Sequence, residues 1–400
     1  MRLSRRAQQI QPSATLTIAA KAKELKSQGI DVIGFGVGEP DFPTPPHIVD
    51  AAVEALRAGD TRYTPVGGTP ELRAAIVKML ERDYGLTYTP AEVTVSSGAK
   101  HTLFNVFMSL IDEGDEVVIP APYWVSYPEQ VQVAGGTPVF APTREDEGFL
   151  LRAEVLEAAL TPRTRAVVLN SPSNPTGAMY GVPELQALAE VLRGRDLVVV
   201  SDDIYHKLTY DGGRFCSLLH VAPDLRDRVV IVNGVSKTYA MTGWRIGYAA
   251  GPKSLVTACE DIQSQSTSNP TSFAQKGAAV ALAGPQDCVD VMVAAFAERR
   301  RLLVDGLNTL PGVRCSMPQG AFYAFPNVSA LYGSQTPSGA TLADSLAVTA
   351  YLLEEARVAV VPGGPFGSEE HLRISYATSL DQLREGLSRM GDALGKLRRA

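Results

Sequence analysis

The sequence predicts an α/β fold in which a mostly parallel sheet is sandwiched by helices, followed by a smaller α+β domain. Short, unbroken apolar runs alternate with helical patterns up to Gly251, as expected for strands buried on both faces of a parallel sheet. After Gly251 the pattern changes to longer helices and a few strand-like runs. We therefore expect an N-terminal segment over 1–45 that packs with the small domain, a large domain over 46–290, and a small domain over 291–400.

Capping residues and prolines predict where the first helices begin. Ser13 precedes the first helical pattern, and Thr69 precedes Pro70 in the third. The expected helices cover residues 16–27, 46–58, 70–83, 99–110, 125–134, 152–160 and 183–193. The expected strands, rich in β-branched residues, cover residues 31–35, 92–96, 116–119, 137–140, 166–170 and 197–201.

Two further strands, over 228–232 and 244–250, flank a short excursion that contains Lys237 and Arg245. A parallel crossover needs a dozen or more residues, so these strands should run antiparallel or bend. Lys237 and Arg245 would then lie at the same edge of the sheet. In the small domain, helices are expected up to Leu310 and over 345–355 and 381–397, with strand-like segments over 313–326, 358–361 and 371–376.

Composition favours a cytoplasmic protein. The chain has 400 residues, 45% apolar, with a formal net charge of −6, and no basic cluster suggests a nucleic-acid partner. No apolar run is long enough for a membrane span, and no export signal follows the basic N-terminus. The four cysteines form no C-x-x-C pair, and the five histidines show no metal-binding spacing, so we expect neither disulfides nor a metal.

The excursion after residues 228–232 has the residue types that an aldehyde cofactor with a phosphate needs. The amine of Lys237 could bond to the aldehyde, while Ser236 and Arg245 hold the anion. An isolated Lys is far more often a solvated surface residue, so the neighbouring residues have to support this interpretation.

Other polar residues follow the expected strands, where open α/β sheets bind ligands. The turn at residues 96–100 suits a phosphate, although a plain helix cap explains it equally well. Lys100 makes a bound anion the better explanation, because the helix dipole disfavours a cation at the N-terminus of a helix. Asp202 could pair with a protonated pyridine nitrogen or merely cap a loop, and Arg373 could clamp a carboxylate or face solvent. For Asn174, Tyr205, Tyr123 and Trp124, taken alone, turn formation or core packing is the simpler explanation.

The order of short motifs along nearly the whole chain resembles one family. The motifs are the segments 36–42, 63–65, 97–100, 122–124, 174–177, 201–205, 234–247, 320–323 and 373–376. Together they resemble class I and II aminotransferases, pyridoxal 5'-phosphate (PLP) enzymes of fold type I, and most closely the bacterial aspartate aminotransferase branch. Asp203 and Ser173 depart from that pattern, where Glu and Asn are usual, without touching an implied catalytic role.

The resemblance implies PLP as cofactor and a homodimer with shared sites. It implies catalytic roles for Lys237, which bonds to PLP and moves a proton, and for Asp202 and Tyr205. It implies cofactor contacts for Gly98, Ala99, Trp124, Asn174, Asp202, Tyr205, Ser236, Lys237, Arg245 and, from the neighbouring subunit, Tyr63. It implies substrate contacts for Gly38, Lys100, Trp124, Asn174, Arg373, Ser13 and Thr15.

The expected reaction is transfer of the amino group of aspartate to 2-oxoglutarate. The alternatives are transfer from aromatic amino acids or prephenate-like substrates, β-elimination on the same fold, and a non-catalytic PLP-binding regulator. Lys100 and the N-terminal segment are where we expect the choice of substrate to be made.

Overall fold

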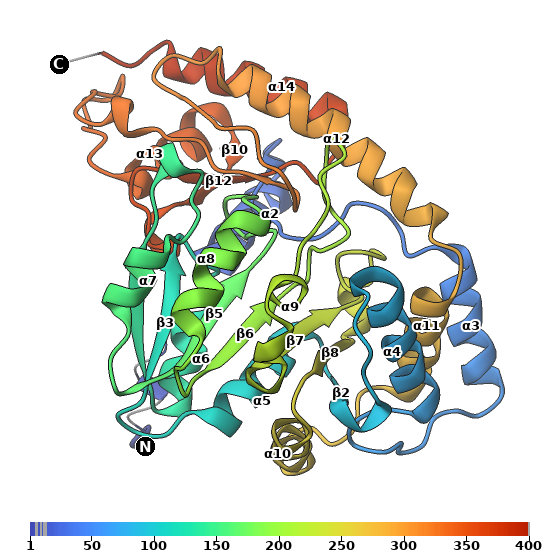
Figure 1. Ribbon diagram of the computed structural model, residues 1–400. Helices are drawn as coiled ribbons and strands as arrows, with labels where there is room; N and C mark the ends of the chain where they lie inside the picture. Colours follow the sequence, from blue (N-terminus) through green and yellow to red (C-terminus); the bar gives the residue numbers. More distant parts are fainter. Residues whose placement is uncertain (5–6, 9, 11–13, 399–400) are drawn as a thin grey trace.

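The fold is taken from a computed structural model, which describes residues 1–4, 7, 8, 10 and 14–398. In this part of the chain, seven strands form the central sheet in the order β2-β8-β7-β6-β5-β3-β4 (Figure 1). They are β2 Val93–Ser96, β3 Glu116–Ala121, β4 Thr137–Pro142, β5 Thr164–Asn170, β6 Val198–Asp202, β7 Val229–Gly234 and β8 Gly247–Ala250. Strand β8 is antiparallel to both of its neighbours, and the other pairs are parallel. The predicted mostly parallel sheet and the reversal after β7 are both confirmed.

Helices cover both faces of this sheet (Figure 1). On one face lie α5 Ala99–Leu110, α6 Ser126–Ala134 and α10 Lys253–Ser264. On the other lie α3 Pro46–Arg57, α4 Pro70–Tyr84, α7 Ala153–Ala159, α8 Val182–Leu192, α9 Leu218–Val221 and α11 Ser272–Ala283. Helix α4 begins as the sequence predicts, because the Thr69 hydroxyl accepts a hydrogen bond from the Leu72 N–H at 3.3 Å.

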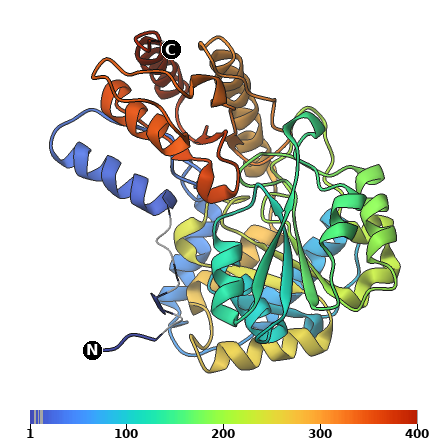
Figure 2. The same cartoon turned by 90° about the vertical axis from the view of Figure 1, so that its left-hand side faces the viewer.

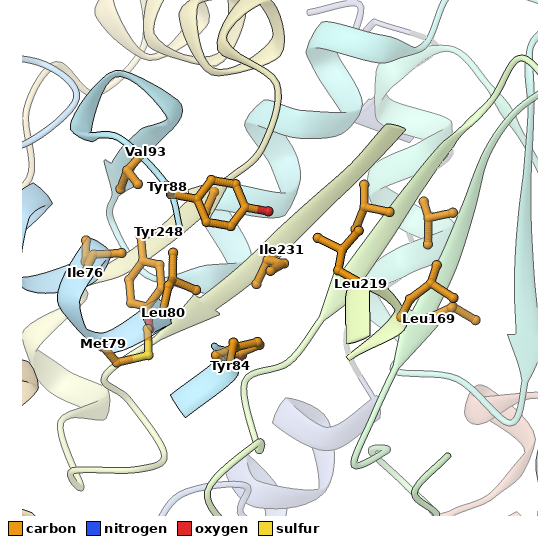
Figure 3. Packing of buried hydrophobic residues seen from close by; sticks show 14 of the residues in the cluster. Ile76, Met79, Leu80, Tyr84, Tyr88, Val93, Leu169, Leu219, Ile231 and Tyr248 are labelled. Atoms are coloured by element: carbon orange, nitrogen blue, oxygen red, sulfur yellow. The ribbon is translucent and has the colours of Figure 1, made fainter. Parts of the chain in front are cut away.

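Successive residues of one strand pack into different cores. In β7, Val230 and Val232 belong to the cluster under α5, whereas Ile231 belongs to the cluster under α4. Figure 3 shows Ile231 beside Leu80, Tyr84 and neighbouring apolar side chains of the second cluster. The strand is therefore buried on both faces, which is the physical reason for its unbroken apolar sequence.

The C-terminal part of the chain builds a second core around short strands. Strands β9 Tyr323–Ala324, β11 Val361–Pro362 and β12 Leu372–Ser375 form an antiparallel sheet, and β1 Ile33–Gly34 pairs in parallel with β10 Val358–Ala359. Helices α12 Asp287–Leu307, α13 Ser345–Tyr351 and α14 Leu380–Leu394 enclose them. Helix α2 Ala14–Ser27 lies against this part of the molecule (Figure 2), where Ala22 packs with Leu353 and Ala359.

Two strand predictions in the second core need correction. The segment 313–326 was expected to be a strand, but β9 covers Tyr323–Ala324 alone among its residues. Pro318 lacks an N–H for a ladder, and the N–H groups of Gln319 and Gly320 both donate to the carbonyl of Gly177 instead. The run 358–361 is divided, because β10 pairs with β1 while β11 pairs with β12.

Among the described residues, no single helix has both the length and the apolar composition to cross a membrane; α11 and α12 meet these criteria only when taken as one pair, which is bent by 80°. The same residues bring no three His, Cys, Asp or Glu side chains together in a group that could hold a metal ion.

The double-sided core predicts that Leu80→Ala will be strongly destabilising. Leu80 is fully buried, so truncation loses apolar burial and leaves a cavity worth about 3 kcal/mol of unfolding free energy. Leu346→Ala is the matched control, because that side chain is 60% exposed on α13. Chemical denaturation of the two variants and the wild type measures the difference, and equal midpoints for Leu80→Ala and Leu346→Ala would contradict the packing described here.

Candidate active site

A cavity of about 270 Å³ lies at the carboxyl ends of the parallel strands. Asn170 and Asp202 reach it from the ends of β5 and β6, and Lys237 reaches it from the excursion after β7. The structure brings most of the predicted site residues to its wall. They are Gly38, Ala99, Lys100, Trp124, Asn174, Asp202, Tyr205, Ser236, Lys237, Arg245 and Arg373.

Two of the other predicted residues, Gly98 and Tyr63, do not line the cavity. Gly98 lies just behind its wall, next to Arg245. Tyr63 is 91% exposed and is not part of the wall. Ser13 lies outside the described residues, and so does the side chain of Thr15 in α2. For these last two residues the predicted role stays a prediction.

Lys237 supplies an enclosed amine. Lys237 is partly exposed and lines the cavity. Its Nζ donates a hydrogen bond to the carbonyl of Gly38. Desolvation lowers the pKa of Lys237 to about 8, with Glu39 opposing this shift and Arg373 adding to it. A Lys with this pKa is partly neutral near neutral pH, as a nucleophile or a base must be.

Asp202 supplies a buried carboxylate. Its Oδ2 accepts a hydrogen bond from the Tyr127 hydroxyl at 2.6 Å, and its Oδ1 accepts one from the Ile204 N–H at 3.3 Å. Burial raises the pKa of Asp202 to about 6, while these hydrogen bonds and the charge of Lys237 restrain the rise. Asp202 is therefore ionised at neutral pH and can pair with a cationic ring nitrogen.

Arg373 supplies a buried guanidinium. It is 2% exposed, donates from Nη1 to Asn174 Oδ1 at 3.1 Å, and donates from Nη2 to the carbonyl of Gly36 at 2.8 Å. Its Nε has no hydrogen-bond partner among the described residues. A buried donor left in this state, on the wall of a cavity, suits a carboxylate ligand.

Three features make a second part of the cavity wall attractive to anions. Arg245 has a backbone φ of 56° and donates from Nη1 to the Thr242 carbonyl at 2.9 Å. Gly98 leaves space for that guanidinium, since a Cβ there would lie 2.5 Å from Arg245 Nη2. Lys100 is exposed, with Nζ 5.1 Å from the centre of the Trp124 ring, and partial desolvation and Arg245 lower its pKa.

Among the wall residues that the sequence interpretation missed are Tyr127, Asn170 and Tyr323. Tyr127 holds Asp202, the Asn170 amide oxygen accepts from the Asn174 N–H at 2.9 Å, and the Tyr323 hydroxyl lies 2.9 Å from that of Tyr205. Tyr323 belongs to the motif 320–323, and Asn170 ends an expected strand, so both had a signal. Tyr127 had none, because it occupies an ordinary position at the start of a helix.

A family model described as "Aminotransferase class I and II" matches residues 30–390. The chain belongs to this family. An aspartate aminotransferase of Geobacillus stearothermophilus is 53% identical, and the match covers 98% of each chain. An aspartate/prephenate aminotransferase of Nitrosomonas europaea is 50% identical, over 98% of this chain and all of its own. The structure of an aspartate aminotransferase from Rhizobium meliloti superimposes with a TM-score of 0.96 at 47% identity, over the full length of both chains.

Membership confirms the predicted family, the fold and a PLP-dependent aminotransferase. The site of this aminotransferase also fits that cofactor. The cavity offers an enclosed amine for an aldehyde, a buried carboxylate for a ring nitrogen, and a glycine-bounded cationic end for a phosphate.

The pKa of the Lys237 amine predicts how the rate at which the cofactor-free aminotransferase bonds to added PLP depends on pH. The neutral amine is the reactive form, so the rate should rise with pH through about 8, whereas an ordinary lysine would respond near 10.5. The measurement is the mass of PLP fixed by borohydride after short incubations. Lys237→Ala should fix none at any pH. Lys78→Ala, which removes an exposed lysine of α4, is the matched control that should fix PLP as the wild type does. A fixed mass on Lys237→Ala would contradict the assignment.

The hydrogen bond between Tyr127 and Asp202 predicts the effect of Tyr127→Phe. Removing the donor leaves a buried carboxylate less well oriented, so PLP binding should weaken by roughly tenfold. Equilibrium titration of the cofactor-free protein measures this. Tyr123→Phe is the control, since the Tyr123 ring stacks on Phe140 and does not line the cavity; equal affinities of the two variants would show that the contact does not matter.

Proposed function

We propose that the protein transfers the amino group of aspartate to 2-oxoglutarate with PLP. The observation that carries this proposal is the pair of cations that lines the cavity beside Lys237 and Arg245, namely Arg373 and Lys100. Two such groups suit the two carboxylates of a dicarboxylic acid. Relatives named aspartate aminotransferase support it, as does a 44% identical Thermus thermophilus aspartate aminotransferase that was solved with maleate, a dicarboxylate.

We assign the cofactor-holding roles as follows. PLP, when bound, supplies the electron sink that lets a bond at the substrate α-carbon break. Asp202 pairs with the ring nitrogen, Tyr205 and Asn174 contact the ring hydroxyl, and Trp124 stacks on the ring. The phosphate is held by Gly98, Ala99, Ser236 and Arg245, with Tyr63 reaching it from the neighbouring subunit.

The substrate-handling roles follow from charge and reach. Arg373 binds the α-carboxylate through its planar fork, assisted by Asn174 and Gly38. Lys100 binds the distal carboxylate, helped by Ser13 and Thr15. With both carboxylates fixed, the Cα–H bond is oriented, and Nζ of Lys237 in its neutral form takes the α-proton.

Prephenate is the second candidate, as the amino acceptor. Relatives from Nitrosomonas europaea and Cereibacter sphaeroides, at 50% and 51% identity, are named aspartate/prephenate aminotransferases. Assays with aspartate and either 2-oxoglutarate or prephenate, following oxaloacetate, separate the two acceptors. Pyruvate with ammonia would indicate a lyase, and no turnover with PLP bound would indicate a regulator.

We further propose a cytoplasmic homodimer with shared sites, since Tyr63 is 91% exposed and does not line the cavity of its own subunit. Each subunit would consist of a large domain over 46–290 and a small domain over 291–400, with residues 1–45 packing on the small domain. The pairing of β1 with β10 supports this last contact. Helix α12 begins at Asp287, a few residues before the proposed boundary.

The aspartate proposal predicts a selective effect of Lys100→Ala. Loss of the partner for the distal carboxylate should lower kcat/KM for aspartate by about a hundredfold and for alanine by less than about threefold. Steady-state assays with both donors measure the ratio, and Lys78→Ala, an exposed lysine of α4, is the control. Equal losses for aspartate and alanine would refute the role of Lys100.

A further inference from the structure

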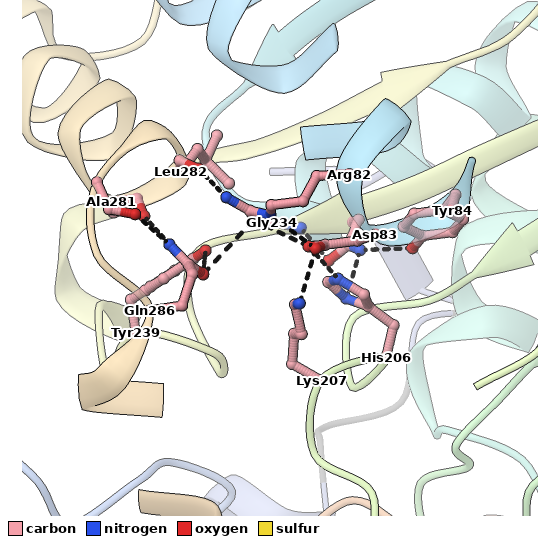
Figure 4. A network of polar contacts seen from close by, with 12 residues as sticks. Arg82, Asp83, Tyr84, His206, Lys207, Gly234, Tyr239, Ala281, Leu282 and Gln286 are labelled. Atoms are coloured by element: carbon pink, nitrogen blue, oxygen red, sulfur yellow. Dashed lines mark hydrogen bonds and ion pairs between the residues drawn. The ribbon is translucent and has the colours of Figure 1, made fainter. Parts of the chain in front are cut away.

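The C-terminal end of α4 carries a polar cluster that the active site described above does not include (Figure 4). At its centre, the Asp83 carboxylate accepts hydrogen bonds from Arg82 Nε at 2.7 Å and Lys207 Nζ at 2.7 Å, and it lies 3.5 Å from His206 Nε2. The side chains of Asp83 and His206 are 4% and 6% exposed. A buried carboxylate with this many partners holds them in one geometry, because losing it would leave buried groups unpaired.

One arm of the cluster leads to the strand end that precedes Lys237. Asn233, fully buried in β7, donates from Nδ2 to His206 Nδ1 at 2.9 Å and accepts from the Gly234 N–H at 2.7 Å. His206 Nδ1 is therefore the acceptor, which assigns the ring proton to Nε2 and directs it to Asp83. The backbone N–H of His206 also donates to the Asp203 carbonyl at 2.9 Å, within the turn that follows Asp202 and β6.

A second arm leads to the other side of Lys237. Arg82 donates from Nη1 to the Leu282 carbonyl at 2.8 Å and contacts Gln286 Oε1 through Nη2 at 3.5 Å. The same Gln286 oxygen accepts a hydrogen bond from the Tyr239 hydroxyl at 2.8 Å. Tyr239 follows Lys237 by two residues, so the segment from Gly234 to Tyr239 is connected to the end of α4 at both of its ends.

We propose that Asp83 is a positioning residue for the cofactor. It holds the segment from Gly234 to Tyr239, which carries Lys237, in a fixed position relative to Asp202 at the end of β6. Asp83 does not line the cavity, so it acts through Asn233 and His206 on one side and through Arg82 and Gln286 on the other. The inference rests on PLP as the cofactor of this family and is independent of the proposed amino-acid substrate. It also gives the His206-Lys207 pair a role that its sequence position after Tyr205 did not suggest.

Asp83→Asn tests the proposal, since it keeps the shape of the side chain and removes its charge. Misalignment of Lys237 and Asp202 should weaken PLP binding to the cofactor-free protein by about tenfold. It should also reduce the visible circular dichroism per mole of bound PLP, a signal that depends on how the ring is held. Glu81→Gln is the matched control, because it removes an exposed carboxylate from the same helix; it should leave both measurements at wild-type values.

A purely structural role gives a different result. Asp83→Asn would then lower the melting temperature of the cofactor-free protein while PLP affinity and circular dichroism stay at wild-type values, and this outcome would overturn the proposal. If Asp83→Asn does not fold, Lys207→Gln removes one partner of Asp83 and should weaken PLP binding by about threefold in the same assay. Unchanged affinity and circular dichroism for Lys207→Gln would then overturn it. No amino-acid substrate is used, so failure of the aspartate proposal would not affect these results.

Discussion

The candidate active site depends on one enclosed amine, that of Lys237, which must be able to lose its proton. Desolvation lowers the pKa of Lys237 to about 8, and Arg373 and Arg245 act in the same direction while Glu39 opposes them. The Gly38 carbonyl accepts a hydrogen bond from Nζ, so the amine has a polar partner without a full counter-charge. The neighbouring cations therefore have two effects, since they make the cavity attractive to anions and disfavour protonation of the amine.

The sheet explains how residues far apart in sequence reach this amine. Parallel strands β5, β6 and β7 end at one edge, and each delivers a polar residue there. Strand β8 reverses direction, which lets a short excursion carry Lys237 out and bring Arg245 back. The close approach of β8 to the start of α5 requires Gly247, because a Cβ there would lie 2.1 Å from the Ala99 nitrogen.

Sequence patterns predicted the sheet and most of the cavity wall, for a physical reason. Buried parallel strands need unbroken apolar runs, and the polar residues that follow them must meet at one edge, so Lys237, Asp202 and Asn174 were predictable. The contacts of Tyr127 and Asp83 were not, because both residues lie on helices whose local patterns are satisfied by packing alone. Their partners come from β6 and the turn that follows it, and such pairings depend on the tertiary arrangement. The prediction of a continuous strand over 313–326 was wrong for a related reason, since the N–H groups of Gln319 and Gly320 donate to the Gly177 carbonyl and not to a neighbouring strand.

The two adjacent carboxylates at the end of β6 show how the fold limits negative charge near Lys237. Asp203 is as buried as Asp202, but its partner is the Ser201 hydroxyl at 2.7 Å, and burial together with the charge of Asp202 raises its pKa well above the ordinary value. Burial and the charge of Asp202 both favour the neutral form of Asp203, because two buried charges on neighbouring residues would repel each other. The Tyr127 hydroxyl and the Ile204 N–H both donate to Asp202, so the fold stabilises negative charge on this carboxylate, which lies on the cavity wall where a cationic ring nitrogen needs it.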